Sequence, residues 1–266
     1  MDLGLGGRTA LVTGSYRGTG AGIARVLARE GARVVVHGLE PGQADEVAEE
    51  IRGGGGEAFT VTGDVRTAEG ARAAAGSALD AAGRVDVLVN NYGAAAGGGW
   101  LDDPDADWRE MFETNVLSGA RMVHHLVPGM VERGWGRVVF VGTVGSVRPR
   151  ARMPGYYAAK ASLPNMTVSL AKELAHSGVT VNTVSPGLIA TAEVRAGLLR
   201  RAEREGWGSD WDEIQRRAAS DFMPNPSGRI GTVEEVGALV AFLASDLAGY
   251  VNGADLRIDG GSAECV

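Results

Sequence analysis

Tyr156 and Lys160 are the two residues whose types and spacing most directly suggest chemistry. Four residues apart on a helix, a phenol and an ammonium lie on one face, one turn from each other. The cation favours the phenolate, so we expect Lys160 to lower the pKa of Tyr156 toward working pH and make it a general acid/base. Many helices carry such a pair by chance, as a half-buried ring beside a solvated amine. The pair therefore needs support from elsewhere in the chain.

A glycine-rich stretch near the N-terminus supplies that support. The sequence TGSYRGTG, from Thr13 to Gly20, directly follows an apolar run. Glycines at a strand-to-helix turn let the backbone approach a pyrophosphate, and the helix N-terminus favours its negative charge. Taken alone, such a motif is at least as often an ordinary strand-to-helix turn as a nucleotide-binding turn. Together with Tyr156 and Lys160, it suggests hydride chemistry on a bound nicotinamide cofactor.

Composition limits the classes of protein to consider. The chain has 266 residues, 44% hydrophobic and 22% charged, enough for one sizeable core. Its formal net charge of −7, without long blocks of one sign, disfavours nucleic acid as a partner. The one cysteine, Cys265, cannot form an internal disulfide, and no run approaches the roughly 18 apolar residues of a membrane span. We expect a cytoplasmic protein without a membrane partner.

Strand-like and helix-like segments alternate along the chain. Strands are expected at residues 9–13, 33–36, 58–61, 85–89, 137–141, 179–184 and 255–258. Helices are expected at residues 23–31, 43–52, 67–82, 107–133, 193–205, 210–222 and 233–244, and around Tyr156 toward His176 with a bend at Pro164. Crossovers between parallel strands need helices, so the pattern predicts an α/β fold, a doubly wound parallel sheet of about seven strands with helices on both faces. Without a linker or repeat, residues 1–266 are expected to form a single domain.

Several short motifs occur in a fixed order, and together they resemble the short-chain dehydrogenase/reductase family. They are TGSYRGTG at 13–20, Gly63-Asp64-Val65, Asn90-Asn91-Tyr92-Gly93, Asn115, Tyr156 with Lys160, Pro186-Gly187 with Thr191, and Asp259-Gly260-Gly261. The subgroup that resembles it most nearly includes 3-oxoacyl carrier-protein reductases. The resemblance implies an NAD(P)-binding Rossmann fold, an oxidoreductase acting on a carbonyl and secondary-alcohol pair, and a homotetramer or dimer.

The resemblance also implies which residues bind the cofactor. They are Gly14, Ser15, Tyr16, Arg17, Gly18, Gly20, His37, Asp64, Val65, Asn91, Gly93, Tyr156, Lys160, Pro186, Gly187, Ile189 and Thr191. Asp64 and Val65 match the positions that hold the adenine, and Thr191 matches a hydroxyl that fixes the nicotinamide amide. The family usually has alanine where Tyr92 stands, which puts a large ring near the cofactor. No metal site is implied.

The choice between NADP and NAD depends on the end of the second expected strand. NAD enzymes need a carboxylate there, and that carboxylate repels the extra phosphate of NADP. Gly38 stands in its place, and Arg17 lies where NADP-dependent relatives carry a base that can pair with the phosphate. Against this, Leu39 stands where many of them have a second arginine, and Glu40 is near. We expect NADP (NADPH) as the cofactor. The alternative is an NAD-dependent enzyme, in which Arg17 would be an ordinary surface residue.

By the same resemblance, Tyr156 gives a proton to the substrate carbonyl during reduction, or accepts one from the alcohol. Lys160 lowers the pKa of Tyr156 and holds the nicotinamide ribose. Asn115 matches the residue that supports a proton-relay water beside the lysine. The alternative for Asn115 is a helix-interior asparagine bonded to its own backbone.

Thr143 occupies the place of the family's usual serine, which orients the substrate carbonyl. Threonine keeps the hydroxyl donor, adds a methyl group and stiffens the side chain, so we expect a working but tighter site. Ser146 is the alternative if the local turn is shifted, and a site without catalysis is a further alternative. Tyr157 is one residue along from Tyr156 and is expected to face away from Lys160.

The sequence says least about the substrate, expected to be a small carbonyl or alcohol compound. Arg148, Arg150 and Arg152 could attract an anionic or acyl-thioester substrate, although such arginines more often form a solvated surface. Residues at about 190–228 correspond to the family's variable lid over the substrate, with an oligomer contact or simple packing as the alternative. For the whole chain, the alternative to an enzyme is a dinucleotide-binding sensor or scaffold.

Overall fold

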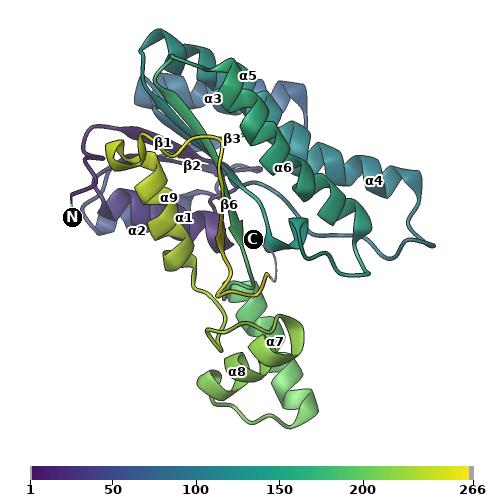
Figure 1. Cartoon of the computed structure of the whole chain (residues 1–266). Coiled ribbons are helices and arrows are strands. Elements are labelled where there is room, and N and C mark those ends of the chain that lie inside the picture. The colour runs from purple at the N-terminus through teal and green to yellow at the C-terminus, as the bar shows by residue number, and fades with distance from the viewer. Residues whose placement is uncertain (1, 264–266) are drawn as a thin grey trace.

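The computed structural model describes residues 2–263, so Cys265 lies outside the described residues. Within them, seven strands pair in parallel in the order β3-β2-β1-β4-β5-β6-β7 (Figure 1). Their bounds are β1 Thr9–Val12, β2 Arg33–Gly38, β3 Ala58–Thr62, β4 Val87–Asn90, β5 Gly136–Val141, β6 Val179–Pro186 and β7 Asp255–Ile258. The predicted doubly wound parallel sheet is confirmed.

The central strands are short valine-rich runs whose side chains are buried on both faces of the sheet. β-Branched residues fit a pleated surface that helices cover on both sides. In β1, Ala10 and Val12 pack in one core, whereas Leu11 packs in the other. Alternate residues of one strand thus fill two separate cores.

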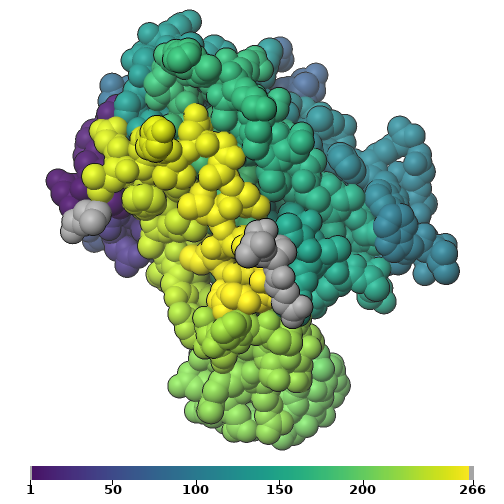
Figure 2. Space-filling model, viewed as in Figure 1, coloured from purple at the N-terminus to yellow at the C-terminus, as the bar shows by residue number. Residues whose placement is uncertain are grey.

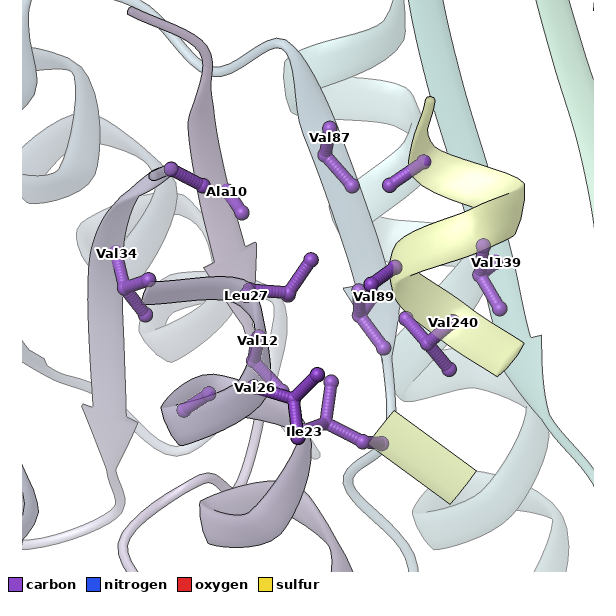
Figure 3. Close-up of a cluster of buried hydrophobic side chains, with 14 of the residues drawn as sticks. Ala10, Val12, Ile23, Val26, Leu27, Val34, Val87, Val89, Val139 and Val240 are labelled. Carbon is purple, nitrogen blue, oxygen red and sulfur yellow. The ribbon is translucent and has the colours of Figure 1, made fainter. Parts of the chain in front are cut away.

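Helices cover both faces of the sheet (Figure 1). The first core lies against α1 Gly18–Arg29, α2 Asp45–Gly53 and α9 Val233–Ala244, and Figure 3 shows its centre. The second core lies against α3 Ala68–Ala82, α5 Ser118–Glu132 and α6 Pro154–Glu173. The strand order reverses between β1 and β4, so their loops diverge and leave a crevice at the carboxyl edge of the sheet. Within residues 2–263, no helix has the length and hydrophobicity needed to span a bilayer.

The helix predicted at residues 107–133 is present, and it contains one π-helical turn that was not predicted. The segment contains α4 Asp105–Phe112, a π-helical turn Glu113–Leu117, and then α5. A π-helical turn adds one residue to a helix that continues on both sides of it. Helix α6 likewise continues on both sides of Pro164.

Helices α7 Ala192–Glu205 and α8 Trp211–Phe222 form a hairpin between β6 and α9. Figure 2 shows this hairpin as a lobe that projects from the body of the molecule. Its two helices enclose a small core of their own, with Trp207, Ile214 and Ala218 buried at its centre. The hairpin falls in the region expected to differ among family members.

Helices α1 and α9 pack closely because glycines lie at their contact. A Cβ atom on Gly22 would lie 2.4 Å from the Cβ of Val233. A Cβ atom on Gly237 would lie 2.6 Å from Cγ2 of Val26. The helix that follows the glycine-rich turn is therefore fixed against the last helix of the chain.

We predict that Gly22→Ala lowers the free energy of unfolding by about 1–3 kcal/mol, because the added methyl overpacks the contact with Val233. Gly76→Ala is the matched control, since Gly76 also lies inside a helix but its Cβ would meet no atom within 4 Å. The control should raise the free energy of unfolding by roughly 0.5–1 kcal/mol. Urea denaturation measures both, and equal effects of the two substitutions would contradict the packing argument.

Candidate active site

The crevice at the carboxyl edge of the sheet contains a cleft of about 810 Å³. Its walls come from the segments after β1, β4, β5 and β6 and from α6 and α7. The predicted site residues in its lining are Gly14, Tyr16, Arg17, Gly18, Gly20, Asn91, Gly93, Thr143, Tyr156, Lys160, Pro186, Gly187, Ile189 and Thr191. The structure thus brings together residues that are far apart in the sequence.

Other lining residues were not predicted from the sequence. They are Thr19, Ala94, Ala95, Val141, Gly142, Leu188, Glu193 and Val194. Four of these eight, Thr19, Ala94, Gly142 and Leu188, are immediate neighbours of predicted residues, so adjacency to a motif was the available signal for them. The place of Glu193 at the cleft depends on where α7 begins. Its carboxylate pairs with Arg17 Nη1 at 3.4 Å across the cleft mouth.

The turn after β1 places backbone amides at the cleft. Gly14 has a φ of +62°, a conformation that favours glycine, and a Cβ there would lie 3.1 Å from the Tyr92 backbone. Helix α1 begins at Gly18, and among the described residues no side chain caps its first turn and no acidic residue lies in that turn. Its N–H groups are therefore available to an anion such as a pyrophosphate. The turn fits a dinucleotide.

Three predicted cofactor residues lie behind the wall of the cleft. The side chains of Ser15 and His37 are fully buried, and Val65 packs in the second core. The Ser15 hydroxyl accepts a hydrogen bond from the His37 N–H at 3.0 Å and donates one to the Val12 carbonyl at 2.6 Å. Ser15 and His37 therefore support the loops of the cleft from below.

Asp64 lies in the loop after β3 and is paired with Arg66. Arg66 Nη2 donates to Asp64 Oδ2 at 2.8 Å, and Nε donates to Oδ1 at 2.9 Å. These hydrogen bonds lower the pKa of the Asp64 carboxyl. The charges of Asp64 and Arg66 both act on the phenol of the half-buried Tyr92. The pKa of Tyr92 is raised mainly by burial. Any adenine contact of Asp64 must be shared with Arg66.

Tyr156 lines the cleft with its phenol largely buried. Burial raises the pKa of Tyr156 to about 12, and a hydrogen bond with Thr143 acts in the opposite direction. The expected net lowering of this pKa is therefore wrong for this structure, because burial outweighs the favourable neighbours. At neutral pH the phenol is protonated, as a proton donor must be.

Lys160 lies one helical turn from Tyr156 and is buried. Its Nζ donates a hydrogen bond to the Val141 carbonyl at 2.8 Å, and burial lowers the pKa of Lys160 to about 8. A Cβ on Gly93 would lie 3.0 Å from this Nζ and 2.6 Å from Oδ1 of Asn115. The side chains of Lys160 and Asn115 therefore meet at Gly93, where only a glycine fits.

Asn115 lies in the π-helical turn and contacts the loop after β4. Its Oδ1 accepts from the Ala94 N–H at 3.1 Å, and its Nδ2 donates to the Ala94 carbonyl at 3.0 Å. Nδ2 also donates to the Met111 carbonyl at 3.0 Å, which is the backbone contact expected for a helix-interior asparagine. The expected bond to its own helix backbone is thus present, and the two bonds to Ala94 hold the loop that lines the cleft there.

Tyr157 and Ser146 lie apart from the lining of the cleft. The Tyr157 ring packs against Gly145, where a Cβ would lie 2.2 Å from its Cε1 atom. Ring centroids of Tyr156 and Tyr157 are 5.3 Å apart. The Ser146 hydroxyl is buried and has no hydrogen-bond partner within residues 2–263. The hydroxyl at the cleft wall beside Tyr156 is that of Thr143.

Two of the arginines between Thr143 and Tyr156 bind backbone carbonyls. Arg148 Nη1 donates to the Pro224 carbonyl at 3.3 Å and also to the Ser262 carbonyl. Arg150 donates to the Phe222 carbonyl. These bonds connect the segment after β5 with the base of the hairpin and with the end of the chain. They orient both guanidinium groups toward the hairpin.

Comparisons with known proteins agree with this geometry. Residues 14–263 match the family model described as Enoyl-(Acyl carrier protein) reductase. An uncharacterized oxidoreductase, YvaG, from Bacillus subtilis (strain 168) is 35% identical over 269 residues, covering 100% of both chains.

Solved structures are similar over the same extent. L-sorbose reductase from Gluconobacter frateurii, complexed with NADPH and L-sorbose, has a TM-score of 0.93 at 31% identity, covering 100% of both chains. A 3-oxoacyl (acyl-carrier-protein) reductase from Agrobacterium tumefaciens C58, with NADP bound, has a TM-score of 0.86 at 37% identity, covering 98% of this chain and 96% of that chain. The chain therefore belongs to the short-chain dehydrogenase/reductase family of nicotinamide-dinucleotide-dependent oxidoreductases.

Proposed function

We propose that this protein is an NADP-dependent oxidoreductase that interconverts a ketone and a secondary alcohol, with Tyr156 as the general acid/base. The observation that carries the proposal is the meeting of Thr143, Tyr156 and Lys160 in the cleft that also contains the uncapped N-terminus of α1. When bound, the nicotinamide supplies or accepts the hydride. The glycine turn and the segment from Pro186 to Thr191 would hold the dinucleotide.

Tyr156 gives its proton to the carbonyl oxygen in the direction of reduction. Its raised pKa keeps the phenol protonated until negative charge develops on that oxygen. The Thr143 hydroxyl stabilises the same oxygen by a hydrogen bond. Lys160, whose pKa is about 8, is mostly charged at neutral pH and favours the phenolate that remains after transfer. Asn115 keeps the Ala94 loop in place beside them.

The proposed preference for NADP depends on charge near the adenosine ribose. Gly38 leaves the end of β2 without the carboxylate that would repel a 2′-phosphate. Arg17 is exposed at the cleft, and an exposed ion pair such as Arg17 with Glu193 is weak. The 2′-phosphate of NADP can therefore replace Glu193 as the ion-pair partner of Arg17. NADPH and NADP are the cofactors named for the two solved structures above.

We propose an uncharged hydroxyketone, or the corresponding alcohol, as the substrate. Arg148 and Arg150 are occupied by backbone carbonyls, which supports an uncharged compound over an anionic one. The similarity to L-sorbose reductase includes the hairpin, since it covers both chains completely. A 3-oxoacyl thioester is the second candidate, supported by the similarity to the 3-oxoacyl reductase. Activity profiling with ketoses, 3-oxoacyl thioesters, keto acids and cyclic ketones, each with NADPH and NADH, separates these classes.

We further propose that the hairpin, at about residues 190–228, is the substrate lid and that the protein is a homotetramer or dimer. Two features support assembly. Phe112 and Leu117 are exposed apolar side chains at the two ends of the π-helical turn, and among the described strands β7 lies at the edge of the sheet, paired with β6 alone. Sedimentation that gives only monomer would remove this part of the proposal.

We predict that Tyr156→Phe lowers kcat by about 10²–10⁴, because the phenyl ring cannot donate a proton. The dissociation constant for NADPH should stay within a factor of two or so, because the ring still fills its place. Tyr157→Phe is the matched control and should leave both quantities near the wild-type values. Full turnover by Tyr156→Phe would rule out its role. Tight NADPH binding by a wild-type protein inactive on the whole substrate panel would instead favour the sensor or scaffold.

We predict that Thr143→Val lowers kcat/KM by about 10²–10³, because valine keeps the shape and removes the hydroxyl donor. Thr143→Ser restores the donor without the methyl group and should retain most activity. Steady-state kinetics on the substrate found by profiling measure both. Equal activity of the valine and serine variants would show that the hydroxyl does not act on the substrate.

We predict that Arg17→Leu raises the dissociation constant for NADPH by about 10-fold to 100-fold, as loss of a charged hydrogen bond does, and leaves that for NADH nearly unchanged. Glu193→Gln is the control, since it frees Arg17 and should tighten NADPH binding. Fluorescence titration with both cofactors measures these constants. An equal loss of affinity for NADH and NADPH would show that Arg17 does not contact the 2′-phosphate.

A further inference from the structure

His37 is a buried histidine that connects two loops of the cofactor cleft. It is the next-to-last residue of β2, and its side chain is fully buried. Nδ1 accepts a hydrogen bond from the Gly14 N–H at 2.9 Å. Nε2 lies 2.9 Å from the Gly63 carbonyl oxygen, at the start of the loop that carries Asp64. The backbone N–H of His37 is held by the Ser15 hydroxyl.

These partners allow one protonation state of the ring. The Gly14 N–H is a donor, so Nδ1 must present its lone pair. The Gly63 carbonyl is an acceptor, so Nε2 must carry the hydrogen. The neutral Nε2–H form satisfies both bonds. In the neutral Nδ1–H form both bonds are lost, and in the imidazolium form an N–H at Nδ1 is directed against the N–H of Gly14.

We propose that His37 is a positioning residue for the cofactor, which in its neutral Nε2–H form joins the glycine turn to the loop after β3, and that protonation of the ring weakens dinucleotide binding. Gly14 lies on the cleft wall with positive φ, and its N–H donates to Nδ1 of His37 behind that wall. His37 itself lies behind that wall and acts through Gly14 and Gly63. This inference deepens the proposed function, since it rests on the cleft being a dinucleotide site.

The surroundings of the ring favour its neutral form. Burial lowers the pKa of His37, while the Gly63 hydrogen bond and the charge of Asp64 act in the opposite direction. Asp64, from the loop after β3, is the titratable group among the described residues whose charge acts on His37, and its own pKa is lowered by Arg66. The turn after β1 presents the Gly14 amide to the ring and the Ser15 hydroxyl to the backbone of His37.

The direction of the pH effect follows from this shift. Burial lowers the pKa of His37 in the folded protein below its ordinary value of 6.5. The contribution of His37 to the free energy of unfolding is therefore fully present above about pH 6.5 and falls as the pH drops toward the folded-state pKa. The ring of the folded protein is protonated only when the pH reaches that folded-state pKa, and there the loosened turn should bind the dinucleotide less tightly.

The first test measures the NADPH dissociation constant by fluorescence from about pH 8 down to the lowest pH at which circular dichroism shows the protein still folded, because the pKa of His37 lies below its ordinary value. His37→Leu removes the acceptor for Gly14 and should weaken binding by about tenfold at the alkaline end, as loss of a buried hydrogen bond does. His37→Asn offers an amide oxygen near the position of Nδ1 but does not titrate, so it should bind more tightly than the leucine variant. Its affinity should fall less than that of the wild type as the pH is lowered.

His124→Asn is the matched control, because it removes an exposed histidine of α5. It should keep the pH profile of the wild type. Titration of the NADPH phosphate affects every variant alike, so the difference between wild type and His37→Asn isolates the ring. Parallel pH profiles for these two proteins would overturn the proposal, and so would an unchanged affinity in His37→Leu.

The second test reads the tautomer directly in the free protein by ¹⁵N-edited NMR of the histidine rings. The expected result for His37 at neutral pH is a protonated Nε2 and an unprotonated Nδ1. An Nδ1–H tautomer or an imidazolium at neutral pH would overturn the proposal, even if the leucine variant does not fold. A protein whose His37 shows the expected tautomer but which binds neither NADPH nor NADH would overturn the proposed function instead.

Discussion

The site depends on one constraint, that the carboxyl ends of all strands in a parallel sheet lie at the same edge. Because the strand order reverses between β1 and β4, the loops at that edge separate and leave room for a ligand. The glycine turn, the Ala94 loop, Thr143 and the segment after Pro186 are thereby brought to one cleft from four different parts of the sequence. Helix α6 then adds Tyr156 and Lys160 from the side.

The fold was largely predictable from the sequence, because its signals are local. Strands built from valine runs have both faces buried, and the glycine turn and capped helices mark where the chain changes direction. The π-helical turn at Glu113–Leu117 could not be read in the same way, because a single added residue inside a continuous helix leaves no distinct local signal. This turn carries Asn115, which bonds to the loop after β4.

The sequence predicted which residues form the candidate site better than it predicted their pKa values. Helical spacing places Tyr156 near Lys160, but the direction of a pKa shift depends on burial, which spacing does not contain. His37 illustrates the same limit, since a motif places it beside the cofactor while the structure turns its ring into the protein. The contact between Arg17 and Glu193, 176 residues apart, has no signature in the sequence.

The α7–α8 hairpin has a consequence for how such a protein can diversify. Its core of Trp207, Ile214 and Ala218, to which Ile230 at the base also belongs, is separate from the two cores of the sheet. A backbone bridge between Ile189 and Gly231 closes its base, so substitutions beyond that base need not disturb the packing that holds Tyr156. Substitutions in α7 can therefore change the lining of the cleft at Glu193 and Val194 while the two cores of the sheet stay as they are.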